Sequence, residues 1–349
     1  MTEADAEQRA GDARSARAAN IFDVARLAGV SHQTVSRVIN SVPNVRPATR
    51  IRVEQAIAQL RYSPSPAARA LVTKRTRTIG LITPGASQYG PTSTAVNFNV
   101  AARAARFSVD TVSALDSDPA GIRAIVESLL RQRVDAIVLV VTDIAVLEVV
   151  LALELAIPIV IVAASSRRSP AIVSIDQYRG ARMAVRHLIE LGHTDIFHLA
   201  GPPEAPDAIE RIRGWRDEIQ ENRLTLHEAV HGDWSARSGY ELRGRLPLLG
   251  KGSAVFAGND YMALGLISAL AEEGLRIPDD SSIVGFDDVP EAAYFMPPLT
   301  TVRQDFAALG SLIMQKVLIA IEDPEDVALS VPMPTSLIVR RSSLARPAL

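Results

Sequence analysis

The sequence has no cysteine among its 349 residues, and it has no long uninterrupted apolar run. The lack of cysteine excludes disulfides, thiolate zinc sites and cysteine nucleophiles, and it is typical of a reducing compartment. The first 19 residues have no apolar core of the kind a secretory signal needs, so we expect a disordered leader. The most apolar region, 146–164, is interrupted by Glu148, Glu154 and Pro158, which favours a helix and a buried strand over a membrane span. We therefore expect a cytoplasmic protein without a membrane partner.

Net charge is also small, because 37 Lys and Arg stand against 39 Asp and Glu. This near neutrality hides an asymmetry. Residues 20–75 contain nine Lys or Arg and two acids, Asp23 and Glu54, which gives this segment a formal charge of +7. The rest of the chain carries the compensating acid. A basic segment on an acidic body indicates a polyanionic partner for that segment alone.

Three helical patterns occupy residues 20–62: IFDVARLAG, SHQTVSRVIN and PATRIRVEQAIAQL. The first ends at Gly29, a common helix stop, and Ser31 can cap the second. Two helices joined by the short AGV segment predict a helix-turn-helix. The second helix also has a polar face of His, Gln, Ser and Arg, which solubility alone does not require. The residues that we expect to face inward are Val35, Val38, Ile39, Ile51 or Val53, Ile57 and Leu60.

The pattern changes after a proline-containing linker, in which Pro66 can begin a short helix. From Thr78 onward, short apolar strand-like runs alternate with helical patterns, which predicts parallel sheets covered on both faces. The runs are too many for one small sheet, so the predicted fold is α/β, with two doubly wound parallel-sheet lobes behind an all-α helix-turn-helix domain. The strand-like runs are 78–83, 107–113, 134–141, 157–164, 171–176, 195–202, 254–260, 282–288, 299–306 and 335–341.

The motifs together resemble the lactose/galactose repressor (LacI/GalR) family. The segments NIFDVARLAGVSHQTVSRVIN and SPSPAARALVTKRTRTIGLI are followed, in the expected order, by HLIELGHTDIFHLAGP, GDWSARSGY, AGNDYMALG, SIVGFDD and PPLTTVRQDF. The motifs DWSARSG and VRQDF are most similar to those of the lactose-type members. The resemblance implies a transcription regulator, most often a repressor of carbohydrate-metabolism genes, which binds a pseudo-palindromic double-stranded operator and is neither an enzyme nor dependent on a cofactor.

The resemblance also implies a domain order and an assembly. It divides the chain into a leader (1–19), a helix-turn-helix domain (20–63), a hinge helix with its linker (64–77) and a two-lobe effector-binding and dimerisation domain (78–349). The two lobes resemble periplasmic binding proteins, and a small sugar would bind between them as the allosteric effector. The chain ends nine residues after Arg340 without the heptad tail that forms tetramers in lactose-type members, so we expect a homodimer.

The polar face of the second helix is suited to reading DNA. Gln pairs with adenine and Arg with guanine in the major groove. His32, Gln33 and Arg37 lie at the helix start and one turn on, where helix-turn-helix proteins contact bases. By resemblance, Leu71 is a wedge that enters the minor groove at the operator centre and kinks the duplex. The resemblance also implies four phosphate contacts: Thr34, Ser36, Asn40 and Arg50.

Trp234, Arg211, Asn259 and Asp287 are suited to bind a sugar, which needs planar polar groups for its hydroxyls and an aromatic face for its C–H side. Asn259 and Asp287 each follow a predicted strand at its carboxyl end, where α/β folds bind ligands. The effector contacts that the resemblance implies are Arg211, Trp234, Asn259, Asp287, Gln304 and Phe306. The first lobe departs from the lactose-type pattern, because Val140 and Ala163 replace polar residues there. A different glycoside or a larger oligosaccharide therefore also fits.

Three alternatives stay open at this point. A purine-type corepressor fits, since an aromatic residue at position 234 can stack on a base. A sugar-binding transport protein fits the two lobes, although the missing signal and the basic module oppose it. The segment HEAVH, from His227 to His231, matches a zinc-hydrolase signature. Gly232 ends any helix there, but the segment reads as a strand, in which these two histidines also share a face.

Overall fold

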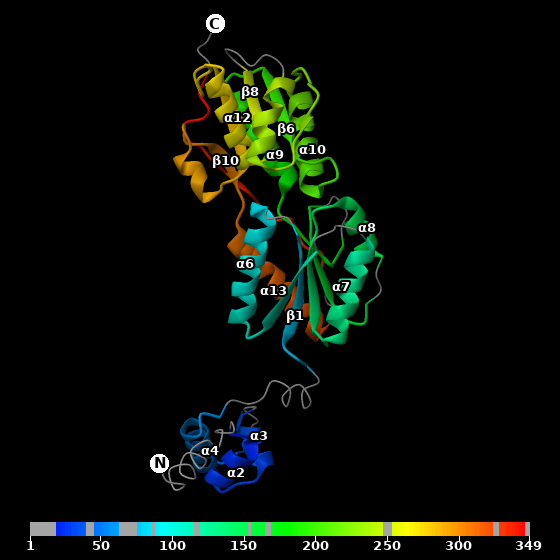
Figure 1. The fold of residues 1–349 in the computed structure, drawn as a ribbon, viewed down its shortest axis with the longest axis vertical. Coiled ribbons are helices and arrows are strands. Elements are labelled where there is room, and N and C mark those ends of the chain that lie inside the picture. Colours follow the sequence, from blue (N-terminus) through cyan, green and yellow to red (C-terminus); the bar gives the residue numbers. More distant parts are fainter. Residues whose placement is uncertain are drawn as a thin grey trace, which may run out of the picture. The chain divides into compact units, whose positions relative to one another are not determined.

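The computed structural model describes residues 19–39, 45–62, 75–85, 88–114, 119–152, 155–164, 169–246, 253–323 and 328–345. The chain divides into two compact units, Met1–Thr76 and Arg77–Leu349, each of which has its own core (Figure 1). Asn40, Leu71, the predicted helix beginning at Pro66 and all but the last residue of the predicted leader lie outside the described residues.

The first unit contains the predicted helix-turn-helix: α2 (Ile21–Ala28), α3 (His32–Ile39) and α4 (Pro47–Gln59). Asn20 and Asp23 form a reciprocal capping box at the start of α2, and Gly29 ends that helix in the left-handed conformation, with φ of 64°. Ser31 caps α3 as predicted, because its hydroxyl accepts from the Thr34 amide. The three helices enclose a small core of Val24, Ala25, Ala28, Val35, Val38, Val53 and Ala56.

The first lobe of the second unit has a five-stranded parallel sheet in the order β2-β1-β3-β4-β5. One face is covered by α6 (Tyr89–Ala104) and α13 (Phe306–Glu322), and the other by α7 (Pro119–Arg131) and α8 (Ile144–Leu151) (Figure 1). Helix α13 lies far from this sheet in the sequence, since it begins at Phe306 and the last strand of the sheet ends at Val173. The strands are β1 (Thr78–Pro84), β2 (Ser108–Ala114), β3 (Ala136–Val140), β4 (Ile159–Val162) and β5 (Ile172–Val173).

The second lobe has a six-stranded sheet in the order β11-β10-β9-β8-β6-β7. Helices α9 (Gln177–Glu190) and α10 (Pro206–Glu221) cover one face, and α12 (Asp260–Glu272), with α11 (Ala236–Glu241) beside it, covers the other. Short 3₁₀ helices span Leu242–Arg245 and Pro290–Tyr294. The strands are β6 (Asp195–Ala200), β7 (Val230–His231), β8 (Ser253–Ala257), β9 (Ser281–Asp287), β10 (Thr300–Arg303) and β11 (Ser336–Ile338).

The prediction that both sheets are parallel is wrong at one edge. Strand β11 pairs antiparallel with β10. The chain leaves the lobe at the end of β10 and re-enters it at the same side just before β11, so the two strands must run in opposite directions. Every predicted strand-like run of the body nevertheless contains a strand, and the two-lobe α/β architecture is confirmed.

Three crossover segments join the two lobes: 174–177 before α9, 303–306 before α13, and 328–335 before β11. The first and third are hydrogen-bonded to each other. The Met333 amide donates to the Ser174 carbonyl at 2.9 Å, and the Asp176 amide donates to the Met333 carbonyl at 2.8 Å. The crossovers bring the carboxyl ends of both sets of parallel strands to one cleft. Within the described ranges, no helix has the length and apolarity needed to cross a membrane.

Candidate functional sites

The exposed face of α3 presents the residues predicted to read bases. Val35 and Val38 are buried against α2 and α4, whereas His32, Gln33 and Arg37 are exposed on the opposite side. The Thr34 hydroxyl lies 3.0 Å from that of Ser31, so the start of α3 holds this predicted phosphate contact in place. Ser36 lies further along α3 and Arg50 lies on α4, both partly buried. The unit therefore offers the polar helix face that the sequence predicts, while Asn40 and Leu71 fall outside the described residues.

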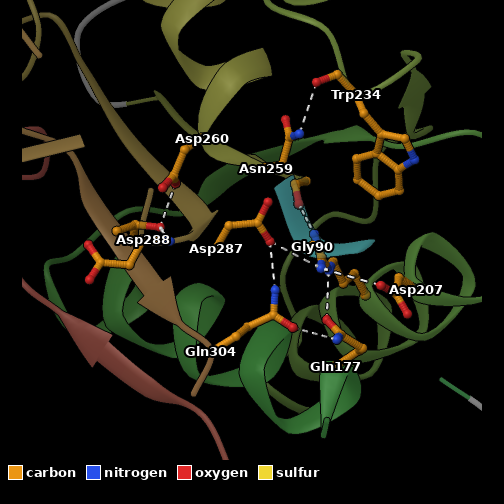
Figure 2. Close-up of polar contacts among 12 residues, drawn as sticks. Gly90, Gln177, Asp207, Trp234, Asn259, Asp260, Asp287, Asp288 and Gln304 are labelled. Atoms are coloured by element: carbon orange, nitrogen blue, oxygen red, sulfur yellow. Dashed lines mark hydrogen bonds and ion pairs between the residues drawn. The ribbon is translucent and has the colours of Figure 1, made fainter. Parts of the chain in front are cut away.

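All six predicted effector residues line one cleft between the two lobes, and this cleft is open to solvent. The second lobe supplies the polar wall with Arg211, Trp234, Asn259 and Asp287, and the second crossover supplies Gln304 and Phe306. Figure 2 shows Trp234, Asn259, Asp287 and Gln304 of this set.

Arg211 of α10 is held from several sides. Its Nε donates to Gln177 Oε1 at 2.9 Å, and its Nη1 donates to the Gly258 carbonyl. Its Nη2 lies 3.5 Å from Asp287 Oδ1 and 3.9 Å from Asp207 Oδ2, both long for an ion pair. The guanidinium also lies over the Phe286 ring, 3.8 Å from its centroid. The Nε and Nη1 sides are thus engaged, and Nη2 is the weakly bonded side.

Trp234 sits on the loop between β7 and α11, in a left-handed conformation with φ of 75°. A side chain at Gly201 would overlap the indole ring, so the ring fits there only because position 201 is glycine. Asn259 caps α12 through its Oδ1 and donates from Nδ2 to the Trp234 carbonyl at 2.9 Å. One amide therefore fixes both a helix start and the loop that carries the aromatic face.

Asp287 ends β9 with φ of 110°, a strained backbone conformation for a residue other than glycine. The fully buried Asp260 supports the loop after it, because its carboxylate accepts from the Val289 amide at 2.9 Å and from the Thr301 hydroxyl at 2.5 Å. A side chain at Gly285 would overlap that carboxylate. Strain at a ligand-facing carboxylate is common where the surrounding contacts enforce it, and Asp260 provides such contacts here.

The pKa of Asp287 is raised to about 6, mainly by burial and also by the nearby carboxylate of Asp207, against the opposing effects of Arg211 and Gln304. Burial also raises the pKa of Asp260 well above its usual range, with repulsion from Asp287 as the second cause. A ligand hydroxyl that donates to Asp287 would favour the ionised carboxylate.

The wall from the first lobe is largely apolar. Val140, Val162 and Ala163 line the cleft there, together with Pro91 of α6 and Leu309 of α13. The two departures noted in the sequence, at positions 140 and 163, thus face the cleft. The charged groups of the site lie on the opposite wall, while Gln88, Tyr89, Thr94 and Thr142 add uncharged polar groups to this one.

Three supporting residues escaped the sequence analysis: Gln177, Asp207 and Asp260. Asp207, in the first turn of α10, lines the cleft with a side chain that is 44% exposed. Its position one helical turn before Arg211 could have predicted that it lies beside Arg211 in the cleft. Asp260 lies in the quoted motif AGNDYMALG, but no sequence pattern gives its contact with a loop almost thirty residues later. Gln177 has no motif at all.

Only the last two residues of the HEAVH segment, Val230–His231, form a strand, so the predicted strand is shorter than expected. His227 packs on Phe197 and lies 3.5 Å from Asp195 Oδ1, whereas His231 Nδ1 lies 2.8 Å from the Gly201 carbonyl. In the part of the chain that the structure describes, no group of three or more His, Asp or Glu could hold a metal ion. These contacts favour structural roles for both histidines.

Comparison with known proteins gives two family matches. Residues 20–65 match the bacterial regulatory proteins of the lacI family, and residues 185–343 match the periplasmic binding protein-like domain. Among curated relatives, the chain is 33% identical to the lactose operon repressor of Escherichia coli over 93% of this chain and 91% of the relative. It is 32% identical to the HTH-type transcriptional repressor PurR of Haemophilus influenzae over 93% of this chain and 98% of that protein.

Solved structures agree with these matches. The Lac repressor dimer bound to operator and the anti-inducer ONPF superposes with a TM-score of 0.84 at 33% identity, over 94% of this chain and all of the other. The complex of the transcriptional regulator CelR with cellobiose superposes with a TM-score of 0.67 at 29% identity, over 93% of this chain and all of the other. The chain therefore belongs to the lacI family of bacterial regulatory proteins, and it is a DNA-binding transcriptional regulator and not an enzyme.

Proposed function

We propose that the protein is a homodimeric repressor whose affinity for a pseudo-palindromic operator is set by a small carbohydrate in the cleft. The observation that carries the proposal is the cleft wall itself. Arg211 and Asp287 present donors and acceptors to the cleft near the face of Trp234, whose loop Asn259 holds in place, an arrangement suited to ring hydroxyls and ring C–H groups. The relatives named above support the operator, the dimer and the sugar. A protein of this function acts in the cytoplasm, where its DNA lies.

The DNA-binding roles rest on α3. We propose that His32, Gln33 and Arg37 contact base edges in the major groove, because they form the exposed face of a helix whose other face is buried. The resemblance adds Thr34, Ser36, Asn40 and Arg50 as phosphate contacts and Leu71 as the minor-groove wedge.

The effector is tested by thermal denaturation of the full chain with lactose, cellobiose, galactose and glucose, repeated with operator DNA selected from a random pool. We expect at least one sugar to raise the melting temperature and to change operator affinity. Arg211→Met is the cleft variant, and the exposed Arg237→Met of α11 is the matched control. The proposal fails if no carbohydrate has an effect, or if both variants respond equally.

A purine corepressor is the second candidate, and the relationship to the PurR repressor favours it. Trp234 could then stack on a base while Arg211 and Asp287 bind its edge. Adenine and guanine are therefore included in the same screen. If a purine raises operator affinity and every sugar has no effect, the effector is a purine base, and the rest of the proposed mechanism is unchanged.

A further inference from the structure

Gln177 is a buried amide that touches the cleft residues without lining the cleft. It is both the last residue of the first crossover and the first residue of α9, and only 4% of it is exposed. Both ends of its side-chain amide are hydrogen-bonded to residues of the effector site. Its effect on the site can therefore only pass through those residues.

The hydrogen bonds of Gln177 belong to a row that runs in one direction. Arg211 Nε donates to Gln177 Oε1 at 2.9 Å, Gln177 Nε2 donates to Gln304 Oε1 at 2.8 Å, and Gln304 Nε2 donates to Asp287 Oδ1 at 2.7 Å (Figure 2). In each amide the oxygen accepts from the preceding residue of the row and the nitrogen donates to the next one, and the row ends at the carboxylate. Rotating either amide by half a turn would place two donors or two acceptors against each other, so the row has one favourable arrangement.

This row fixes the side of Arg211 that faces the ligand. A guanidinium has five N–H donors in a rigid plane, so holding Nε sets the direction of the others. With Nε on Gln177 and Nη1 on the Gly258 carbonyl, the Nη2 edge faces Asp287 and Asp207 at 3.5 and 3.9 Å. These long contacts leave the Nη2 edge able to donate to a ligand.

The same row joins two of the three crossovers. Gln177 ends the first, and Gln304 lies in the second, which leads into α13 of the other lobe. Because the first crossover is already hydrogen-bonded to the third through Met333, the Gln177–Gln304 bond connects all three. A ligand bound to Arg211 or Asp287 is therefore connected through hydrogen bonds to all three segments that join the lobes.

We propose that Gln177 is a positioning residue of the effector site, which orients Arg211 for the ligand and, through Gln304, links the site to the crossovers. The proposal rests on the proposed function and adds a residue to it. Without Gln177, Arg211 loses a buried charge-assisted bond and Gln304 loses the partner that aims it at Asp287.

The first test needs no ligand. In Gln177→Met, which keeps the volume and removes both bonds, we expect hydrogen exchange of the Arg211 Nε–H, followed by NMR, to be at least about tenfold faster. Gln177→Glu keeps the acceptor and should retain wild-type protection. The control is Ser342→Ala, because Ser342 is a fully buried residue of the second lobe whose hydroxyl bonds the Ile283 carbonyl and the Thr300 amide, outside the cleft. It should lower stability and leave this exchange unchanged.

The second test uses the sugars of the screen. We expect Gln177→Met to weaken binding of the active sugar about tenfold or more, and the Gln177→Met/Gln304→Met double variant to lose no more than the worse single variant, since both break the same row. Losses that multiply, or Arg211 exchange that is equal in wild type and Gln177→Met, would overturn the proposal. If no sugar binds the wild type, the proposed function fails, and the exchange experiment still reports whether Gln177 orders Arg211.

Discussion

Replacing Asp287 by asparagine should stabilise the protein and weaken its response to ligand at the same time. The substitution keeps the shape of the side chain and its bond from Gln304, and it removes a carboxylate that the buried site disfavours. Because the folded state raises the pKa of Asp287 from 3.8 to about 6, the native protein holds this proton more tightly than the unfolded chain does. This contribution to stability is fully present below about pH 4 and is lost as the pH rises through 6.

The magnitude follows from that pKa. At 1.36 kcal/mol per pH unit, ionising Asp287 in the native state costs about 3 kcal/mol of unfolding free energy. The value already contains the attraction of Arg211, because that attraction opposes the rise in the pKa. Urea unfolding of wild type and Asp287→Asn should therefore give a stability difference, in favour of the variant, that grows by about 2–3 kcal/mol between pH 3.5 and 7 and is then constant.

Binding should change in the opposite direction. A neutral amide lacks the charge-assisted bonds that a carboxylate makes to hydroxyls, so sugar affinity measured by calorimetry at pH 7.5 should fall about tenfold or more. Asp279→Asn, an exposed residue of the same lobe, is the control and should show neither effect. A stability difference that is the same at pH 4 and pH 7.5 would refute the assignment of the raised pKa to Asp287.

The remaining predictions concern DNA and the aromatic wall. DNA binding by the full chain should fall steeply with salt, and deleting residues 1–76 should abolish it. The remaining two-lobe unit should still unfold cooperatively and bind sugar. Unchanged DNA affinity after the deletion would contradict the assignment of DNA binding to residues 1–76. Arg37→Ala should cost about 1–3 kcal/mol and relax the preference at one operator position, whereas Arg50→Ala should weaken specific and random DNA alike in competition gel shifts; unaltered base preference in both variants argues against base reading. Leu71→Ala should bend the operator less in a circular-permutation assay, since an inserted leucine compensates for unstacking, and equal bending would disprove the wedge. Trp234→Ala should weaken sugar binding and remove the sugar-dependent change in tryptophan fluorescence; a change that persists would place the responding ring elsewhere.

Features set by short-range pattern were predictable. The helix-turn-helix followed from Gly29, Ser31 and the buried valines of α3, all of which act within one or two helical turns. The choice between Ile51 and Val53 was not, because both fit a helical period. The structure buries Val53 and leaves Ile51 53% exposed, since the partner helices decide which side of α4 is covered.

Features that depend on distant contacts could not be predicted. Gln177 and Gln304 are 127 positions apart, and nothing near either residue signals that they meet. The direction of β11 depends on where the chain re-enters the lobe, which alternation of apolar residues does not encode. The HEAVH segment also misled, because its spacing fits a strand while its side chains find separate partners in Asp195 and the Gly201 carbonyl.

The late position of α13 has a consequence for synthesis on the ribosome. Phe306, Leu309, Ile313, Met314 and Val317 fill one face of a sheet whose strands were all made by residue 173. Until about 140 further residues have been translated and have left the exit tunnel, that apolar face is covered by α6 alone, although the helix-turn-helix unit, with a core of its own, can already fold. A nascent chain can therefore fold its DNA-binding unit before the two-lobe unit is complete. We expect nascent chains arrested before α13 to be held by chaperones or degraded by proteases, and truncated products that escape would bind DNA without responding to a sugar.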